Sequence, residues 1–254
     1  MDTYRWFVGA LSILFFYNFM ERYTYLLLDL LTISIPLLRS FEPRIAFYKQ
    51  WTAWLPAILL TGTFFIVWDV WFTHWQIWGF NERYLLGIYC WGLPLEEWLF
   101  FVAVPYACLF LYETIQLLVK RNWLAPYQKL LTGLLILGLV GVGIMHRGQA
   151  YTATTCGLTA AFLGFHYFYV RRPYLSQFYM AYLVMLIPFF IVNGILTGSW
   201  IEEPVVWYND QANLGIRWGT IPIEDVGYGF LLILMNLTLY KARQKRSQHR
   251  YEPA

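Results

Sequence analysis

Long apolar runs, separated by short polar segments, constrain the fold of this chain most strongly. Of its 254 residues, 59% are hydrophobic and 13% are charged, whereas about 25% of a typical soluble domain is charged. Several runs approach or exceed the roughly 20 residues that a transmembrane helix needs. Soluble sandwiches and α/β enzymes have shorter runs, and membrane β-barrels show short alternating segments. The sequence therefore predicts an all-α polytopic membrane protein.

The apolar runs predict about seven transmembrane helices. We expect them at roughly 23–38, 51–72, 95–119, 128–145, 151–170, 176–197 and 222–240. Basic residues concentrate in every second loop and in the tail after the last span. By the positive-inside rule, this pattern predicts that the C-terminus lies in the cytoplasm. We expect the protein to be an integral protein of the cell (inner) membrane. A basic segment directly after a membrane span is typical of an anchor on anionic lipid. Nothing else in the chain indicates binding to nucleic acid.

Two similar units divide the chain. Tyr151-Thr152 echoes Tyr23-Thr24, and a Trp-Gly pair precedes a Pro-x-acid-acid motif at 94–97 and again at 222–225. Repeats of this kind indicate duplicated helical units, here in parallel orientation about an axis along the membrane normal. We expect an N-terminal extension (1–20), a first three-helix repeat (21–120), a linker helix (121–150), a second repeat (151–241) and a basic tail (242–254).

The two acidic motifs are the strongest candidates for chemistry. Each places adjacent carboxyl groups at the start of a predicted span, Glu96 and Glu97 in the first unit and Glu224 and Asp225 in the second. Acidic residues also stabilise helix N-termini, so capping is one interpretation. Ionisable groups at membrane depth are usually functional, which favours acid–base chemistry. Burial and mutual repulsion favour a protonated group, whereas the helix dipole favours ionisation, and the sequence leaves the balance open.

Other polar and aromatic residues are expected to converge on these motifs. Asp69 and Asn193 lie late in spans that end on the side where the acidic helices begin, although Asp69 fits a solvated helix end equally well. Tyr228 shares a helix face with Glu224 and is either a hydrogen-bond partner or packing. Aromatic residues make up 21% of the chain, more than interfacial belts explain. We expect an aromatic-lined cavity, with Trp68, Trp91, Trp98 and Trp218 as candidate substrate-lining residues.

The sequence lacks the motifs of several familiar cofactor and metal sites. It contains no His-rich box, no GxGxxG after a strand, no aspartate cluster for a prenyl diphosphate, no HExxH and no Lys inside the last span. The three cysteines are far apart and predict neither a disulfide framework nor a metal site. We therefore expect no metal and no cofactor, and carboxylate acid–base chemistry on an apolar substrate.

The repeated Pro-x-Glu-(Glu/Asp) pair, the Phe-Ile-Val-Trp-Asp-Val-Trp-Phe stretch at 65–72 and Trp-Gly-Phe-Asn at 78–81 resemble the membrane-embedded lycopene β-cyclases. In that family, two homologous units form the enzyme as separate subunits or as one fused chain, and this chain is similar to the fused form. The resemblance covers about residues 20–241. The second unit differs from the first, because Asp225 replaces the second Glu and Asn193-Gly194 replaces Trp68-Asp69.

The resemblance implies conversion of linear lycopene, or a related carotenoid in the bilayer, to a β-ring product. An acid protonates the terminal double bond, the resulting tertiary cation is attacked by the neighbouring alkene, and a base removes a proton. The hypothesis is one composite site, with Glu96 or Glu97 and Glu224 as acid and base, tuned by Asp225, Asp69 and Asn193. The alternatives are a C50 carotenoid cyclase, a proton-coupled transporter of a hydrophobic solute and a non-catalytic carotenoid-binding subunit. The sequence is also compatible with a homo-oligomer.

Overall fold

The computed structural model describes residues 21–170 and 174–250, with side chains described as far as residue 244. The expected N-terminal extension therefore lies outside the described residues, as do Arg171 and Arg172. Seven α-helices occupy the described part of the chain and match the seven expected spans to within a few residues, except at the end of the last. The helices are α2 Thr24–Arg39, α3 Trp51–His74, α4 Leu95–Leu118, α5 Gln128–Met145, α6 Ala150–Phe165, α7 Tyr174–Leu196 and α8 Ile223–Arg250.

Five of the described helical segments are long and apolar enough to cross a membrane. Helices α2 and α6 have 16 residues each, and α6 continues as a five-residue π-helix, η4, at His166–Val170. Helix α8 runs past the expected end at residue 240, where Lys241 forms an ion pair of 2.6 Å with Glu113 of α4. The protein is an all-α polytopic membrane protein, as the apolar runs predicted.

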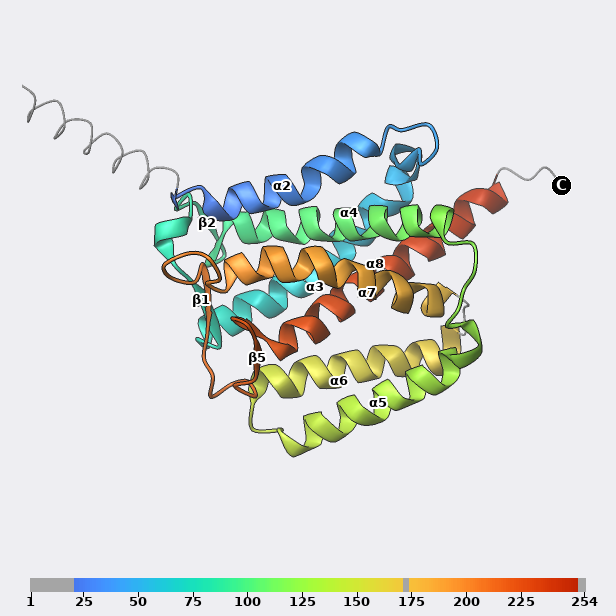
Figure 1. Ribbon diagram of the computed structural model, residues 1–254. Coiled ribbons are helices and arrows are strands. Elements are labelled where there is room, and N and C mark those ends of the chain that lie inside the picture. Colours follow the sequence, from blue (N-terminus) through green and yellow to red (C-terminus); the bar gives the residue numbers. More distant parts are fainter. Residues whose placement is uncertain (1–20, 171–173, 251–254) are drawn as a thin grey trace, which may run out of the picture.

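The two repeats interlock rather than lying side by side. Within each repeat, the first helix packs on the last, so α2 contacts α4 and α6 contacts α8. Between repeats, the middle helices exchange partners, because α3 packs on α8 and α7 packs on α4. Helix α5, the expected linker, packs on α6 and lies along one edge of the bundle (Figure 1). This exchange brings the acidic starts of α4 and α8 into one inter-repeat region.

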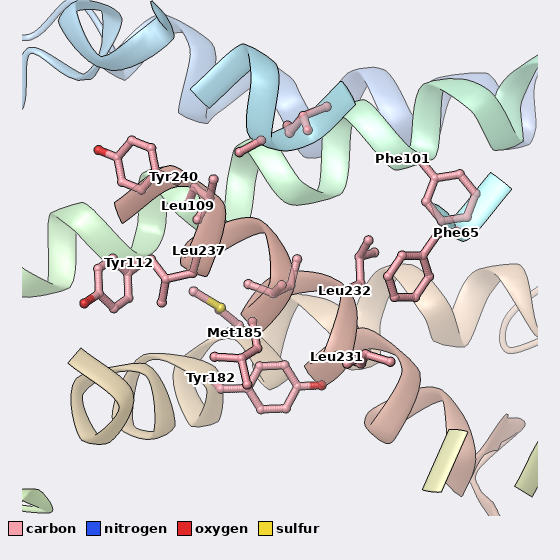
Figure 2. Close-up of a cluster of buried hydrophobic side chains, with 14 of the residues drawn as sticks. Phe65, Phe101, Leu109, Tyr112, Tyr182, Met185, Leu231, Leu232, Leu237 and Tyr240 are labelled. Atoms are coloured by element: carbon pink, nitrogen blue, oxygen red, sulfur yellow. The ribbon is translucent and has the colours of Figure 1, made fainter. Parts of the chain in front are cut away.

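The apolar core surrounds α8 between α3, α4 and α7. Figure 2 shows Leu231, Leu232 and Leu237 of α8 among side chains of the neighbouring helices, including Phe65, Phe101, Tyr182 and Met185. Phe65, Phe101 and Leu232 are at most 1% exposed. Helices that are apolar on every face suit burial in a bundle within a membrane. The core therefore fixes α8 against both repeats.

A short hairpin precedes each acidic helix. Strands β2 (Tyr89–Cys90) and β3 (Leu93–Pro94) pair before α4, and β5 (Arg217–Trp218) and β6 (Ile221–Pro222) pair before α8. The first turn contains Trp91 and Gly92, both at positive φ (53° and 81°), as a two-residue hairpin turn of type I′ requires. These hairpins, together with the short helices η1 Phe47–Gln50, η2 Glu82–Tyr84 and η3 Ala125–Tyr127, were not expected from the sequence.

A third strand pair joins the two repeats directly. Strand β1 (Trp78–Phe80) pairs antiparallel with β4 (Val206–Tyr208), so that Trp78 lies opposite Tyr208 and Gly79 opposite Trp207. Nearby, Arg83 forms ion pairs with Glu21 and Glu202. All the short strands gather at one end of the bundle, the end at which α4 and α8 begin (Figure 1). The strand pair therefore fixes the loops of both repeats over the acidic residues.

Replacing Gly79 with Ala is expected to destabilise this strand pair. A Cβ atom at Gly79 would lie 2.3 Å from Cζ2 of Trp207, so the indole must move. Overpacking of this kind costs about 1–3 kcal/mol, which thermal unfolding of the purified protein in detergent measures as a lower Tm. Gly133→Ala is the matched control, because its Cβ would meet nothing within 4 Å. An unchanged Tm for Gly79→Ala would contradict the close packing of the two loops.

Candidate functional site

An apolar cavity of about 80 Å³ lies where the two repeats meet, at the end of the bundle that carries the short strands. Three carboxyl groups reach it, those of Asp69, Glu97 and Asp225. Its other lining side chains are mostly aromatic or aliphatic: Tyr25, Trp78, Phe80, Phe100, Val104, Tyr151, Phe189, Asn193, Leu196, Val206, Tyr208, Tyr228, Gly229 and Leu232. Side chains from both repeats therefore form one compartment.

Glu97 occupies the first turn of α4 and is 7% exposed. The Tyr25 hydroxyl of α2 donates a hydrogen bond of 2.6 Å to Glu97 Oε2. A second side-chain hydrogen-bonding contact joins Glu97 to Asp69 of α3, and Asp69 also contacts the Trp78 indole. Two carboxyl groups can hydrogen-bond to each other only when one of them carries a proton. Glu97 and Asp69 therefore form a pair that is suited to hold and release one proton.

Asp225 occupies the equivalent turn of α8 but has a different set of partners. The Tyr151 hydroxyl donates to Oδ1 at 2.6 Å, while the Asn193 amide and the Tyr208 hydroxyl donate to Oδ2 at 2.8 and 2.9 Å. Three donors directed at one carboxyl group hold it in a fixed orientation. Burial, followed by the nearby Asp225 charge, raises the pKa of Tyr208 well above its usual value, so this loop tyrosine stays protonated and continues to donate.

The two halves of the site are related by the repeat but are not identical. Tyr25 with Glu97 corresponds to Tyr151 with Asp225, which makes Tyr25, rather than Tyr23, the structural counterpart of Tyr151. Asp69 takes the place beside Glu97 that Asn193 takes beside Asp225. A carboxyl group is therefore exchanged for an amide at this one position, so one half of the site holds two carboxyl groups and the other holds one.

Glu96 and Glu224 lie outside this cavity. Glu96 Oε1 accepts the backbone N–H of Leu86 at 2.6 Å, and Glu224 Oε1 accepts that of Leu214 at 2.8 Å. Both acceptors lie ten residues after their donors, so each glutamate holds the loop that precedes its own hairpin. Adjacent residues of a helix point about 100° apart, which explains why one member of each acidic pair reaches the cavity and the other does not.

The predicted aromatic residues divide in a similar way. Tyr228 lines the cavity and packs against Trp68, with ring centroids 5.1 Å apart, and against Trp78 at 6.0 Å. Trp68 is buried just behind this layer, whereas Trp91 and Trp218 are 71% and 66% exposed. Trp98 packs on Trp91. None of the four predicted tryptophans lines the cavity, and the tryptophan that does is Trp78.

Several site residues were missed by sequence reasoning. Tyr25, Tyr151 and Tyr208 all donate to the cavity carboxyl groups, yet tyrosine is so frequent in this chain that none of them was distinctive. Alignment of the two halves on Tyr25 and Tyr151 could have found the first two. Tyr208 and Trp78 lie in loop strands, where the expected helices gave no guide to position.

The cavity places titratable groups inside an apolar space. No group of three or more His, Cys, Asp or Glu side chains with metal-binding geometry is present in the part of the chain that the structure describes. The cavity combines a pair of neighbouring carboxyl groups, a separate carboxyl group with three hydrogen-bond donors and several aromatic faces, which attract cations. Such an arrangement suits protonation and deprotonation of a hydrocarbon through a cationic intermediate.

Comparison with known protein families gives a match to both repeats. The family model described as Lycopene cyclase matches residues 22–115 and 148–242, which together make up more than half of the chain. No curated protein and no solved structure matches the chain significantly. The two matched regions leave the α5 segment between them unmatched, so the family model describes the two repeats without this helix.

Proposed function

Because the chain belongs to the lycopene cyclase family, we propose that it closes β-rings on linear lycopene by acid-initiated cyclisation, without net redox change. The observation that carries this proposal is one largely aromatic cavity that is lined by the neighbouring carboxyl groups of Glu97 and Asp69 and by the separate carboxyl group of Asp225. A reaction that begins with protonation of an alkene and ends with loss of a proton needs both kinds of group within reach of one substrate end.

In the proposed mechanism, the Glu97–Asp69 pair supplies the proton. Transfer of this proton to the terminal double bond leaves a tertiary cation, and the pair becomes anionic. The neighbouring alkene then attacks the cation, which forms the ring bond and moves the positive charge to an adjacent ring carbon. Electrostatic stabilisation from fixed groups lowers the energy of such charged states, and the faces of Tyr228 and Trp78 add cation–π attraction.

Asp225 is the proposed base. It removes a proton from the ring carbon next to the final cation, and the electron pair of that C–H bond forms the ring double bond. Tyr151, Asn193 and Tyr208 hold the carboxylate in place, so its three donors position a base of modest strength. The cycle gains one proton and loses one, and a proton transfer from Asp225 back to the Glu97–Asp69 pair restores the site.

Exclusion of water is a further requirement of this reaction, because water would trap the cation. Glu97, Asp69 and Asp225 are 7%, 2% and 5% exposed, and aliphatic and aromatic side chains make up the remaining wall. Glu97 and Asp225 lie in the first turns of α4 and α8, and Asp69 lies near the end of α3, rather than at mid-helix, which favours an enzyme over a proton-coupled transporter. We further propose an inner-membrane location with the C-terminus in the cytoplasm, so that the cavity lies toward the opposite face.

Expression of the full chain in cells that accumulate lycopene tests this proposal. We expect chromatography of the pigments to show β-ring products, with the bicyclic product if both ends are processed and the monocyclic one if a single end is. Parallel cells that accumulate a linear C50 carotenoid test the alternative substrate. Unchanged lycopene in cells whose membranes contain the protein would refute the assignment, and cyclisation of the C50 substrate alone would replace lycopene as the substrate.

A further inference from the structure

A second and larger cavity lies on the opposite face of α8, between α5, α6 and α8. Its volume is about 340 Å³, within the range of roughly 300–1,000 Å³ that is typical of small-molecule sites. It shares no residue with the cavity described above. Its walls are mainly aliphatic and include Leu135, Leu139, Val142, Leu163, Ile223 and Val226.

Three polar groups in this cavity have no hydrogen-bond partner among the described residues. They are Oγ1 of Thr155, Oγ1 of Thr159 and Oε2 of Glu224. The three residues are 1%, 2% and 5% exposed. Thr155 and Thr159 are four residues apart on α6 and therefore share a helix face. A buried polar group without a partner costs about 1–3 kcal/mol, so these groups are suited to a ligand that supplies the missing hydrogen bonds.

The other atom of the Glu224 carboxyl group is already occupied. Oε1 accepts both the backbone N–H of Leu214 and the hydroxyl of Thr152, at 2.8 and 2.5 Å. These bonds fix the orientation of the carboxyl group and leave Oε2 as the acceptor that remains. The loop-holding role of Glu224 and its role in the second cavity therefore use different oxygen atoms.

The absence of side chains on Gly138 helps to open this space. A Cβ atom at Gly138 would meet nothing within 4 Å. Helix α5 forms the outer wall, and most of its side chains are only partly buried or exposed. The cavity is thus separated from the expected position of the lipid chains by a single helix at the edge of the bundle (Figure 1).

We propose that this cavity holds one linear apolar chain, acyl or isoprenoid, whose hydroxyl end hydrogen-bonds to Glu224 and to Thr155 and Thr159. The aliphatic walls match the chain, and the clustered polar atoms match a single polar end group. Because Glu224 and Asp225 face different cavities, this ligand is distinct from the polyene bound in the proposed active site. Binding in this second cavity does not depend on the proposed cyclisation.

Native mass spectrometry of the purified full chain tests this site with farnesol and 1-dodecanol as probes. We expect one alcohol molecule to bind per protein, and preference for one probe identifies the isoprenoid or the acyl source. Gly138→Phe should fill the space and weaken binding about tenfold or more, in line with the cost of overpacking. Gly133→Phe, on the same helix but away from the cavity, should bind as the wild type does.

Thr155→Val removes the hydroxyl group but leaves the volume of the cavity nearly unchanged, because valine has nearly the shape of threonine. It therefore tests the polar contact alone. We expect farnesol to bind about 3- to 10-fold more weakly, the loss of one ordinary hydrogen bond, while the hydrocarbon farnesene binds unchanged. Failure of both alcohols to bind the wild type, or wild-type binding by Gly138→Phe, would overturn the proposal. Equal weakening of farnesol and farnesene in Thr155→Val would overturn the assigned polar contact.

Discussion

Glu97→Gln is expected to reduce cyclisation by about 10²- to 10⁴-fold, the usual contribution of a general acid or base. The amide still accepts the Tyr25 hydrogen bond through its carbonyl oxygen, so the fold is retained. It carries no proton that can be transferred to an alkene, and its pairing with Asp69 no longer shares an acidic proton. The measurement is the ratio of cyclised to linear pigment in lycopene-accumulating cells, with equal protein in the membrane.

Glu96→Gln is the matched control for this prediction. Glu96 adjoins Glu97 in the same helical turn but accepts the Leu86 N–H outside the cavity, and glutamine keeps a carbonyl oxygen for that bond. We therefore expect Glu96→Gln to retain most of the activity. The reverse ranking, with Glu96→Gln inactive and Glu97→Gln active, would show that the acid is Glu96 and that the composite cavity does not hold the reacting end.

The helices were predictable from the sequence because a segment that crosses a membrane is apolar along its whole length. A helix such as α4 or α7 is apolar over more than 20 residues. This length of apolar sequence is enough to predict a membrane-spanning helix. The hairpins before α4 and α8 were not predictable by the same means. They contain two residues per strand, and they depend on backbone geometry at Trp91 and Gly92 that hydropathy does not report.

The candidate site was predictable in its location but not in its detail. The repeated acidic motif identified both helix starts, and Asp69 and Asn193 lie beside them as expected. The orientation of each acidic pair depends on helix rotation, which is set by packing between repeats, so the sequence left Glu96 and Glu97 equivalent. Trp78 and Tyr208 reach the cavity only because β1 pairs with β4 across the repeats, a contact between loops far apart in the sequence.

Asp225→Asn is expected to have the second large effect, again about 10²- to 10⁴-fold on cyclisation. It also has a structural cost. Tyr151 donates to one carboxylate oxygen while Asn193 and Tyr208 donate to the other, so an amide must turn its own N–H₂ toward at least one donor. Loss of such a buried pairing costs about 1–3 kcal/mol, which appears as a lower Tm in detergent. Glu224→Gln, which keeps its acceptor for Leu214, is the control.

The double variant Asp225→Asn/Asn193→Asp separates the structural effect from the chemical one. It exchanges the amide and the carboxyl group across the present 2.8 Å hydrogen bond, so that the new amide donates to the new carboxylate. We expect the Tm to recover because the pairing is restored. Cyclisation should stay low, since the carboxylate now lies on α7 and no longer at the start of α8, where the base must meet the ring proton. Full recovery of both Tm and activity would show that any carboxylate in the cavity suffices. Asp225 would then matter as a carboxylate and not for its position relative to the substrate.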